Sequence, residues 1–348
     1  IFMPVSPASV SRPDASRPIL MVGPNWLGDS IMAMPGIRAF REARPGLRLE
    51  LLVKPAQVEI WRLAADAPDD LLLLGPGLKG VLRMALEIKR RGFSEAYVLP
   101  RSFRSVLIPF LAGVPVRVGL PGHARDWMLT RVVRSSRGPG RFHQAWECFD
   151  LFGLAIGSLA PPRLNIPDTA RQAVRKEVGP GSVVLAPGAR RGPSKRWAPG
   201  NFAEVGRRLG EALRRPVLVV GALSEADLCR EVARLAGGGA VSLAGRTSLA
   251  ELAAVFEAAA VVIANDSGAM HLAAAAGAAV VAIFGQTDPA RTGPLSPRAV
   301  VLQDSEVRRR DIPRRSAAAA RSLARITPTR VFEVARSLVL GNNTAHAS

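Results

Sequence analysis

Asp29 is the residue whose type and position best suit acid–base chemistry. It lies in the segment GPNWLGDS (23–30), which follows a short apolar run and precedes a predicted helix. A carboxylate there can accept a proton from a hydroxyl nucleophile, and it can equally do no more than stabilise the exposed N–H groups of the helix. Asn25 and Trp26 lie beside it. Because an indole in a glycine-containing loop has little core to fill, Trp26 is a candidate for packing against the face of a sugar.

A second set of residues suits anion binding. In the segment NDSGAMH (265–271), Asp266, Ser267 and Gly268 lie where a predicted strand ends and a helix begins, and His271 follows one turn later. The first backbone N–H groups of a helix bind phosphates. A helix cap would explain Asp266 or Ser267 alone, and a single helical histidine is usually structural. Their combination at a strand end favours a diphosphate site.

The loop PGARRGPSKRW (187–197) strengthens this prediction. It follows the first predicted strand of the second half and gathers cations between glycines and prolines, which suits a rigid diphosphate-binding loop. Glu225 begins a helix after another strand, where a carboxylate can accept hydrogen bonds from ribose hydroxyls or merely occupy a first helical turn. The nucleotide-binding candidates outside residues 265–271 are Gly188, Ser194, Lys195, Arg196 and Glu225, with Arg190 and Arg191 adding charge.

Two phosphate-loop patterns are set aside. Residues 75–80 match G-x-G-x-x-G, but they do not follow the first strand of their half and they carry a proline in the turn. Residues 23–30 have the spacing of a Walker A loop, yet Asp29 occupies the lysine position and would repel phosphates. Neither segment is predicted to bind a phosphate.

These candidates need a framework of strands to position them. Short apolar runs recur about every 25 residues between helical patterns, which is typical of parallel sheets built from strand–helix–strand units. The predicted strands lie near residues 19–23, 47–53, 71–74, 96–99, 116–119, 182–186, 217–221, 240–243, 261–264 and 280–284. The predicted helices include 31–43, 200–214, 224–236, 248–258 and 267–276.

The framework divides into two halves. A proline-rich stretch at 161–180 separates two series of strands, so the sequence predicts an α/β fold with two tandem doubly wound, Rossmann-like domains. Ligands bind at the carboxyl ends of such strands, and both glycine-rich loops should therefore face one central cleft. We expect a flexible tail at 1–18, an N-terminal domain at 19–165, a C-terminal domain at 166–326, and a C-terminal helix and tail at 327–348.

Composition narrows the class of protein. The 348 residues are 48% hydrophobic with two cysteines, which indicates a globular protein of a reducing, cytoplasmic compartment. We predict no metal, because Cys148, Cys229, His123 and His143 show no ligand spacing. No membrane span is expected either, since the apolar run 269–284 changes from an alanine-rich helix to a β-branched strand.

The formal net charge of +19 raises the question of an anionic partner. The arginines are spread along the chain, which argues against nucleic acid. The densest group is seven arginines within residues 308–325, for which a solvated surface and an anionic membrane surface are the two interpretations. Its leading candidates for membrane contact are Arg308, Arg309, Arg310, Arg314 and Arg315.

Taken together, GPNWLGDSIMAMP, YVLPRSFRS, PGARRGPSKRWAPGNFAEV, NDSGAMHLAAAAG and AIFGQTDPARTGPLS resemble the ADP-heptose:lipopolysaccharide heptosyltransferases, closest to heptosyltransferase II. The resemblance runs from about Ile19 to Leu302, returns at SLARITPTRV, and is lost at 305–320. It implies a GT-B fold, in which the C-terminal half binds ADP-heptose and the N-terminal half receives the lipopolysaccharide acceptor. Asp29 occupies the position of the family's catalytic acid, and Lys195 that of its phosphate-binding lysine. Asp266, Ser267, Gly268 and His271 occupy the positions of its nucleotide-binding motif. The acceptor-side candidates are Asn25, Trp26, Arg101, Ser102 and Arg104.

The resemblance also implies a reaction. Asp29 would deprotonate a hydroxyl of an acceptor heptose, which attacks the anomeric carbon with inversion, while Lys195 stabilises the leaving diphosphate without a metal. We expect a cytoplasmic enzyme peripheral to the inner face of the inner membrane, with no nucleic-acid partner. The alternatives are a sibling transferase that adds the first or third heptose or another sugar, and a non-catalytic nucleotide-sugar-binding protein.

Overall fold

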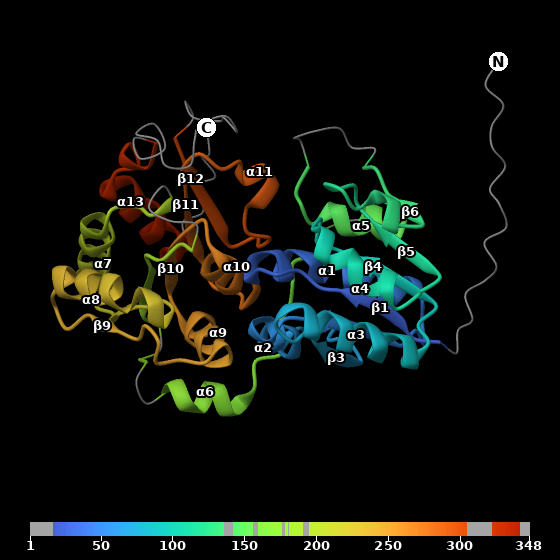
Figure 1. Cartoon of the computed structure of the whole chain (residues 1–348). Helices are drawn as coiled ribbons and strands as arrows, with labels where there is room; N and C mark the ends of the chain where they lie inside the picture. Colours follow the sequence, from blue (N-terminus) through green and yellow to red (C-terminus); the bar gives the residue numbers. More distant parts are fainter. Residues whose placement is uncertain are drawn as a thin grey trace, which may run out of the picture.

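The computed structural model describes residues 17–135, 142–155, 159–175, 178–179, 181–190, 195–304 and 322–341. The predicted tail at 1–18 lies almost entirely outside these ranges, and so do Arg191, Ser194 and the five arginines singled out between 308 and 315. The described residues form two α/β halves side by side, each built on one six-stranded sheet (Figure 1).

The first sheet has the strand order β3-β2-β1-β4-β5-β6, and every pairing in it is parallel. Its strands are β1 (Ile19–Val22), β2 (Leu49–Val53), β3 (Asp70–Leu73), β4 (Glu95–Val98), β5 (Val116–Gly119) and β6 (Arg131–Val132). The helices of this half are α1 (Leu27–Ala43), η1 (Pro55–Gln57), α2 (Val58–Leu63), α3 (Gly77–Arg91), α4 (Phe103–Leu111), η2 (Asp126–Met128) and α5 (Trp146–Phe152).

The second sheet repeats this topology, with the order β12-β11-β10-β7-β8-β9 and parallel pairings throughout. Its strands are β7 (Val183–Ala186), β8 (Val217–Val219), β9 (Val241–Ser242), β10 (Val261–Asn265), β11 (Val280–Phe284) and β12 (Ala299–Gln303). The helices are α6 (Asp168–Arg175), α7 (Pro199–Leu213), η4 (Leu223–Glu225), α8 (Ala226–Ala236), α9 (Leu249–Ala258), α10 (Gly268–Ala275), α11 (Pro289–Thr292) and α13 (Pro328–Leu340).

In both sheets the strand order reverses between the first and fourth strands, β1/β4 and β7/β10. The loops after β1, β7 and β10 therefore lie at the switch points where doubly wound sheets bind ligands. The segments after these three strands carry Asp29, Lys195 and Asp266, whereas Arg101 and Ser102 follow β4 and Glu225 follows β8. The ten predicted strands are present within a few residues, whereas β6 and β12 were not predicted. β6 has only two residues, and β12 directly follows the proline-containing segment PLSPR.

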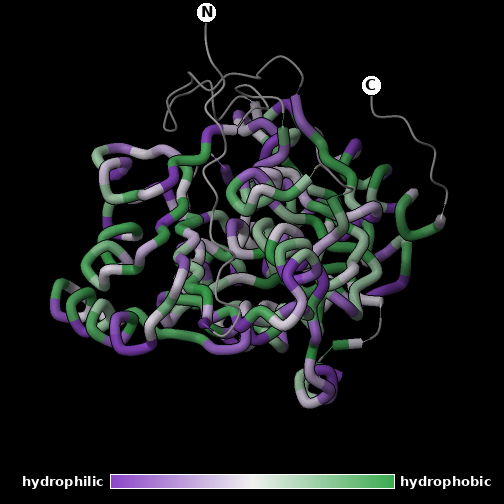
Figure 2. The backbone as a smooth tube through the Cα atoms, turned by 90° about the vertical axis from the view of Figure 1, so that its right-hand side faces the viewer, coloured by the Kyte–Doolittle hydropathy of each residue, from purple (hydrophilic) through white to green (hydrophobic). Residues whose placement is uncertain are grey.

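The two halves share an apolar interface. Helix α1 packs against α10 and α2 against α9, and one continuous cluster of buried residues includes Ile31 and Ile37 from the first half with Met270 and Leu272 from the second. Figure 2 shows hydrophobic residues along the segments in the middle of the molecule, whereas the outer helices and turns carry both hydrophobic and hydrophilic residues. The run 269–284 forms α10 and β11, as predicted. Among the described helices, none is long and apolar enough to cross a bilayer.

Candidate active site

Asp29 lies in the first turn of α1, directly after the turn that leaves β1. The helix begins at Leu27, earlier than the predicted start near Ile31, and Trp26 is its extended N-cap residue. Trp26 cannot cap the helix with an oxygen, because its side chain has none. The short connection from β1 to α1 therefore holds the carboxylate near the carboxyl end of β1.

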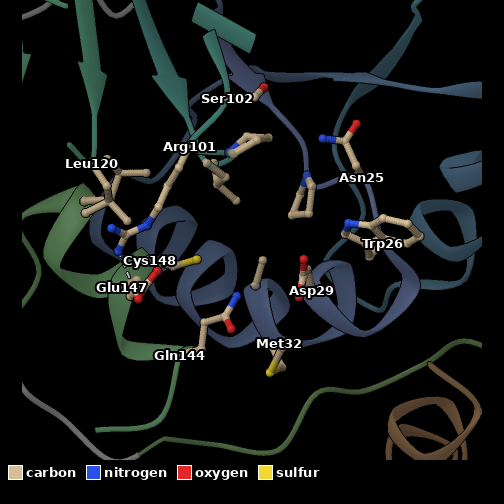
Figure 3. Close-up of a pocket in the computed structure, with 15 residues that line it drawn as sticks. Asn25, Trp26, Asp29, Met32, Arg101, Ser102, Leu120, Gln144, Glu147 and Cys148 are labelled. Carbon is tan, nitrogen blue, oxygen red and sulfur yellow. Dashed lines mark ion pairs between the residues drawn. The ribbon is translucent and has the colours of Figure 1, made fainter. Parts of the chain in front are cut away.

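Asp29 borders a cavity of about 300 Å³ in the first half. In Figure 3 its carboxylate points into the open space between Asn25 and Trp26 on one side and Gln144 and Glu147 on the other. The full lining is Pro24, Asn25, Trp26, Asp29, Met32, Ala33, Leu99, Pro100, Arg101, Ser102, Leu120, Gln144, Glu147, Cys148 and Leu151. Four of the five acceptor-side candidates line this cavity, whereas Arg104 lies further along α4, exposed and outside the lining.

Glu147 links this cavity to the second half. Its Oε1 forms an ion pair with Nη2 of Arg101 at 3.0 Å, which Figure 3 draws, and Nη2 of Arg291 in α11 lies 3.5 Å away. Nearby, Gln144 N donates to the carbonyl of Arg291 at 2.8 Å. Sequence reasoning missed both Glu147 and Gln144, because neither belongs to a recognisable motif.

His143 makes a second link between the halves. Its Nε2 lies 2.9 Å from the carbonyl of Gly293, and its Nδ1 accepts from Ala145 N at 3.2 Å. An imidazole that accepts at Nδ1 must donate from Nε2, which defines a neutral ring. Burial lowers the pKa of His143, in agreement with this hydrogen bonding.

Arg125 supports the cavity wall from behind. It is fully buried, and its Nη1 donates to the carbonyl of Pro100 and lies 3.4 Å from that of Ser102. Its Nε and Nη2 have no hydrogen-bond partner among the described residues, and burial lowers its pKa. This residue was also missed, because burial of a single arginine in an arginine-rich chain leaves no pattern.

Lys195 and Asp266 form an ion pair on the second half. The Lys195 ammonium contacts Oδ2 of Asp266, which also accepts from the Thr287 hydroxyl at 2.5 Å. Both charged side chains are largely buried. The carboxylate therefore positions the lysine, a role that the sequence did not indicate.

Asn265 joins the two loops of the nucleotide-binding side. Its Oδ1 accepts from Trp197 N at 3.0 Å and its Nδ2 donates to the carbonyl of Pro187 at 2.8 Å. The side chain is fully buried at the end of β10. It thereby fixes residues 187 and 197, the two ends of the segment that contains Lys195, beside the start of α10. Asn265 was overlooked because an amide at a strand end has many ordinary roles.

Ser267 and His271 lie at the start of α10. Ser267 is the extended N-cap residue, and its buried Oγ has no hydrogen-bond partner among the described residues. His271 is buried, and burial lowers its pKa to about 4, so the ring is neutral near pH 7. A Cβ on Gly28 would lie 2.7 Å from Cδ2 of this ring. Only glycine at residue 28 allows α1 and α10 to approach this closely.

Glu225 lies beside Gly188 and Arg196. Its Oε2 accepts from Ala222 N at 3.1 Å, its Oε1 is 3.8 Å from Nη2 of Arg196, and a Cβ on Gly188 would lie 2.3 Å from the carboxylate. The structure thus brings these three candidates together. The Arg190 guanidinium of the second half lies 4.8 Å from the centre of the Trp26 ring of the first, which is an attractive cation–π arrangement.

Comparison with known proteins identifies the family. Residues 81–317 match glycosyltransferase family 9 (heptosyltransferase). The chain belongs to glycosyltransferase family 9. It is 27% identical to lipopolysaccharide heptosyltransferase 2 of Escherichia coli K12, over 92% of this chain and 98% of that protein.

Solved structures agree on the fold of this family 9 glycosyltransferase. The E. coli ADP-heptose lipopolysaccharide heptosyltransferase II superposes with a TM-score of 0.82 at 24% identity, covering 94% of this chain and all of that one. The E. coli heptosyltransferase WaaC with ADP-2-deoxy-2-fluoro heptose gives 0.63 at 17% identity over 92% and 99%. The predicted GT-B fold is confirmed.

The glycine pattern at residues 75–80 has a structural explanation. This turn folds onto the start of α3, where a Cβ on Gly80 would lie 2.2 Å from the carbonyl oxygen of Gly75. These glycines serve a tight contact between turn and helix. Among the described residues, no group of three or more histidine, cysteine, aspartate or glutamate side chains could hold a metal ion.

Proposed function

We propose that this transferase moves heptose from ADP-L-glycero-D-manno-heptose to the heptose of the lipopolysaccharide inner core, the reaction of heptosyltransferase II. The observation that carries the proposal is the position of Asp29, which lines a cavity of the first half and lies on α1, the helix that packs against α10 beside the Lys195–Asp266 pair of the second half. The relative in E. coli K12 bears the name of this activity, and WaaC was solved with a fluorinated ADP-heptose.

In the proposed reaction, Asp29 is the general base. It takes the proton of an acceptor hydroxyl held in the cavity, while that oxygen forms a bond to the anomeric carbon of the donor. The bond from this carbon to the ADP oxygen breaks, and its electron pair leaves with the diphosphate. Attack from the face opposite ADP inverts the configuration at the anomeric carbon.

The second half stabilises the leaving group. The Lys195 ammonium, the backbone N–H groups of Ser267 and Gly268 and the positive end of α10 present fixed positive charge to the diphosphate. The ion pair with Asp266 holds Lys195 in place before the donor binds. A neutral His271 beside them adds no competing charge. Arg196, Glu225, Gly188 and Ser194 are proposed to complete the nucleotide site.

The acceptor and the location follow from the same proposal. The walls of the cavity, including Asn25, Trp26, Arg101 and Ser102, would hold the inner-core sugar, with Arg104 outside the lining at its edge. Since this acceptor is carried on lipid A, the enzyme would work at the inner face of the inner membrane as a peripheral protein. We propose that it uses no metal and binds no nucleic acid.

A direct transfer assay tests the reaction. The enzyme is incubated with ADP-heptose and Kdo-lipid A acceptors that carry no heptose, one heptose or two, and the products are weighed by mass spectrometry. Transfer only to the acceptor with one heptose is expected. Transfer to the heptose-free or two-heptose acceptor would instead assign a sibling activity, and donor binding without transfer would assign a non-catalytic role.

Asp29→Asn tests the base. Turnover should fall by about 10²–10⁴-fold with nearly unchanged ADP affinity, because the donor lies on the other half. Asp227→Asn is a matched control, since Asp227 also occupies the first turn of a helix, α8. If Asp29 only stabilised its helix, both variants would lose a little stability and neither would lose turnover.

A further inference from the structure

Helix α3 presents an unusual outer face. Besides Gly77, its exposed residues are three leucines and four cations: Leu78, Lys79, Leu82, Arg83, Leu86, Lys89 and Arg90. The three leucines are 68%, 49% and 59% exposed. They recur every four residues and so form one stripe along the helix. We call these seven residues the leucine–cation face.

The charges of this face are not neutralised locally. None of its four cations forms an ion pair with a described residue, whereas Arg91 in the same helix pairs with Glu50, Asp70 and Glu87. Glu87, the acidic residue of α3, is already paired with Arg91. The face therefore combines uncompensated positive charge with apolar side chains that packing inside the protein does not require, since Met84, Ala85 and Ile88 already anchor the helix to the core.

The face continues towards the cavity of Asp29. Helix α4 packs beside α3 (Figure 1), and its first residues, Phe103 and Arg104, are exposed. They directly follow Arg101 and Ser102, which line the cavity. In a parallel sheet the helices begin at the carboxyl edge of the strands. The start of α3, the start of α4 and the cavity therefore lie along one edge of the first sheet.

We propose that the leucine–cation face docks the enzyme on an anionic lipid surface, with Phe103 and Arg104 at the edge nearest the cavity. Apolar side chains inserted between headgroups, beside cations that attract anionic lipids, are the features by which a helix lies on a membrane surface. A second copy of the chain fits less well, since its face would bring four more cations against these four. The proposal rests on the proposed function only in assuming that the acceptor is held in that membrane.

The docking role of the leucine–cation face can be tested by binding to lipid vesicles in the absence of the sugar donor and the acceptor. Wild-type protein should bind phosphatidylcholine vesicles that contain phosphatidylglycerol, should bind pure phosphatidylcholine weakly, and should be released by salt. Changing Lys79, Arg83, Lys89 and Arg90 to Gln should weaken binding by at least about tenfold. Leu82→Ser with Leu86→Ser should also weaken it by about tenfold. Unfolding temperatures should stay near wild type, because all six side chains are exposed.

A matched control distinguishes the effect of the leucine–cation face on vesicle binding from the effect of the overall net charge. Changing Arg62, Arg234, Arg330 and Arg336 to Gln removes the same charge from exposed positions on α2, α8 and α13. It should weaken vesicle binding by about twofold or less, because charges beyond a Debye length are screened. Equal losses in the two charge variants would overturn the proposal. So would a wild-type dimer in sedimentation that the leucine variant abolishes while vesicle binding stays unchanged.

Activity distinguishes this proposal from the proposed function. Variants of the leucine–cation face should lose transfer to an acceptor embedded in anionic vesicles and keep wild-type turnover on the deacylated, water-soluble acceptor. Loss on both acceptors would overturn the docking role. If the wild type transferred heptose to neither acceptor, the proposed function would fail, and vesicle binding would still decide the docking proposal.

Discussion

Replacing Gly28 by alanine places a methyl group in the contact between the two halves. Its Cβ would lie 2.7 Å from Cδ2 and 3.3 Å from Nε2 of His271, while nonbonded carbons prefer about 3.5–4.0 Å. The His271 ring is buried on α10, so turning it aside would require its neighbours to repack. Helices α1 and α10 must therefore separate by about 1 Å.

The expected cost combines two opposing effects. Overpacking costs about 1–3 kcal/mol, whereas alanine in place of glycine in a helix gains up to about 1 kcal/mol. We expect Gly28→Ala to lower the free energy of unfolding by about 0.5–2 kcal/mol. Gly200→Ala is a matched control, because Gly200 is likewise the second residue of its helix, α7, and a Cβ there meets nothing within 4 Å. This control should be neutral or stabilising.

Urea unfolding of the two variants, of His271→Ala and of the double variant Gly28→Ala/His271→Ala measures the contact. The penalty at residue 28 should disappear when the ring is removed, giving a coupling of about 0.5–3 kcal/mol. Turnover of Gly28→Ala should fall by about 100-fold, because a displacement of 1 Å moves Asp29 away from the donor. If Gly28→Ala were as stable as Gly200→Ala, α1 and α10 would not be in contact in solution.

Three other residues and the metal question provide further tests. Lys195→Ala should weaken ADP binding by about 10- to 100-fold, since a charge-assisted hydrogen bond contributes about 1.5–3 kcal/mol; unchanged affinity in calorimetry would restrict Lys195 to its pairing with Asp266. Burial lowers the pKa of His271 from 6.5 to about 4. Between these two pH values the unfolded chain therefore binds one more proton at this residue than the folded protein does. The free energy of unfolding should therefore decrease as pH falls through this range, by at most about 1.4 kcal/mol per pH unit, and urea titrations of His271→Ala should lack this component. Arg125→Lys has a shorter side chain, so its ammonium should not reach the carbonyls of Pro100 and Ser102 that Nη1 of Arg125 contacts. It should cost about 1–3 kcal/mol and raise the KM for the acceptor; an unchanged KM would contradict the support that Arg125 gives to the cavity wall. Turnover should persist in excess EDTA, and a complete loss that magnesium restores would refute the metal-free reaction.

The sequence alone determined the framework and the loops that carry chemistry. Buried parallel strands require continuous apolar runs, and the turns after them require glycine, proline and small polar residues. Both signals are local. They located ten of the twelve strands in the part of the chain that the structure describes, and they placed Asp29, Lys195 and Asp266 after the ends of strands. The short edge strand β6 escaped prediction because two residues bury too little surface to leave a pattern.

Only the tertiary structure decided which side chains meet across these loops. Asp266 pairs with Lys195 over 71 positions of sequence, and His143 reaches Gly293 over 150. Such contacts depend on how the two sheets pack, and no periodicity encodes them. The same holds for Gly28 against His271 and for the burial of Arg125. The exposure of a side chain is likewise decided by tertiary packing, because the leucines of α3 look like core residues in the sequence. They emerge as a surface because Met84, Ala85 and Ile88, on the other side of the helix, already pack against the sheet.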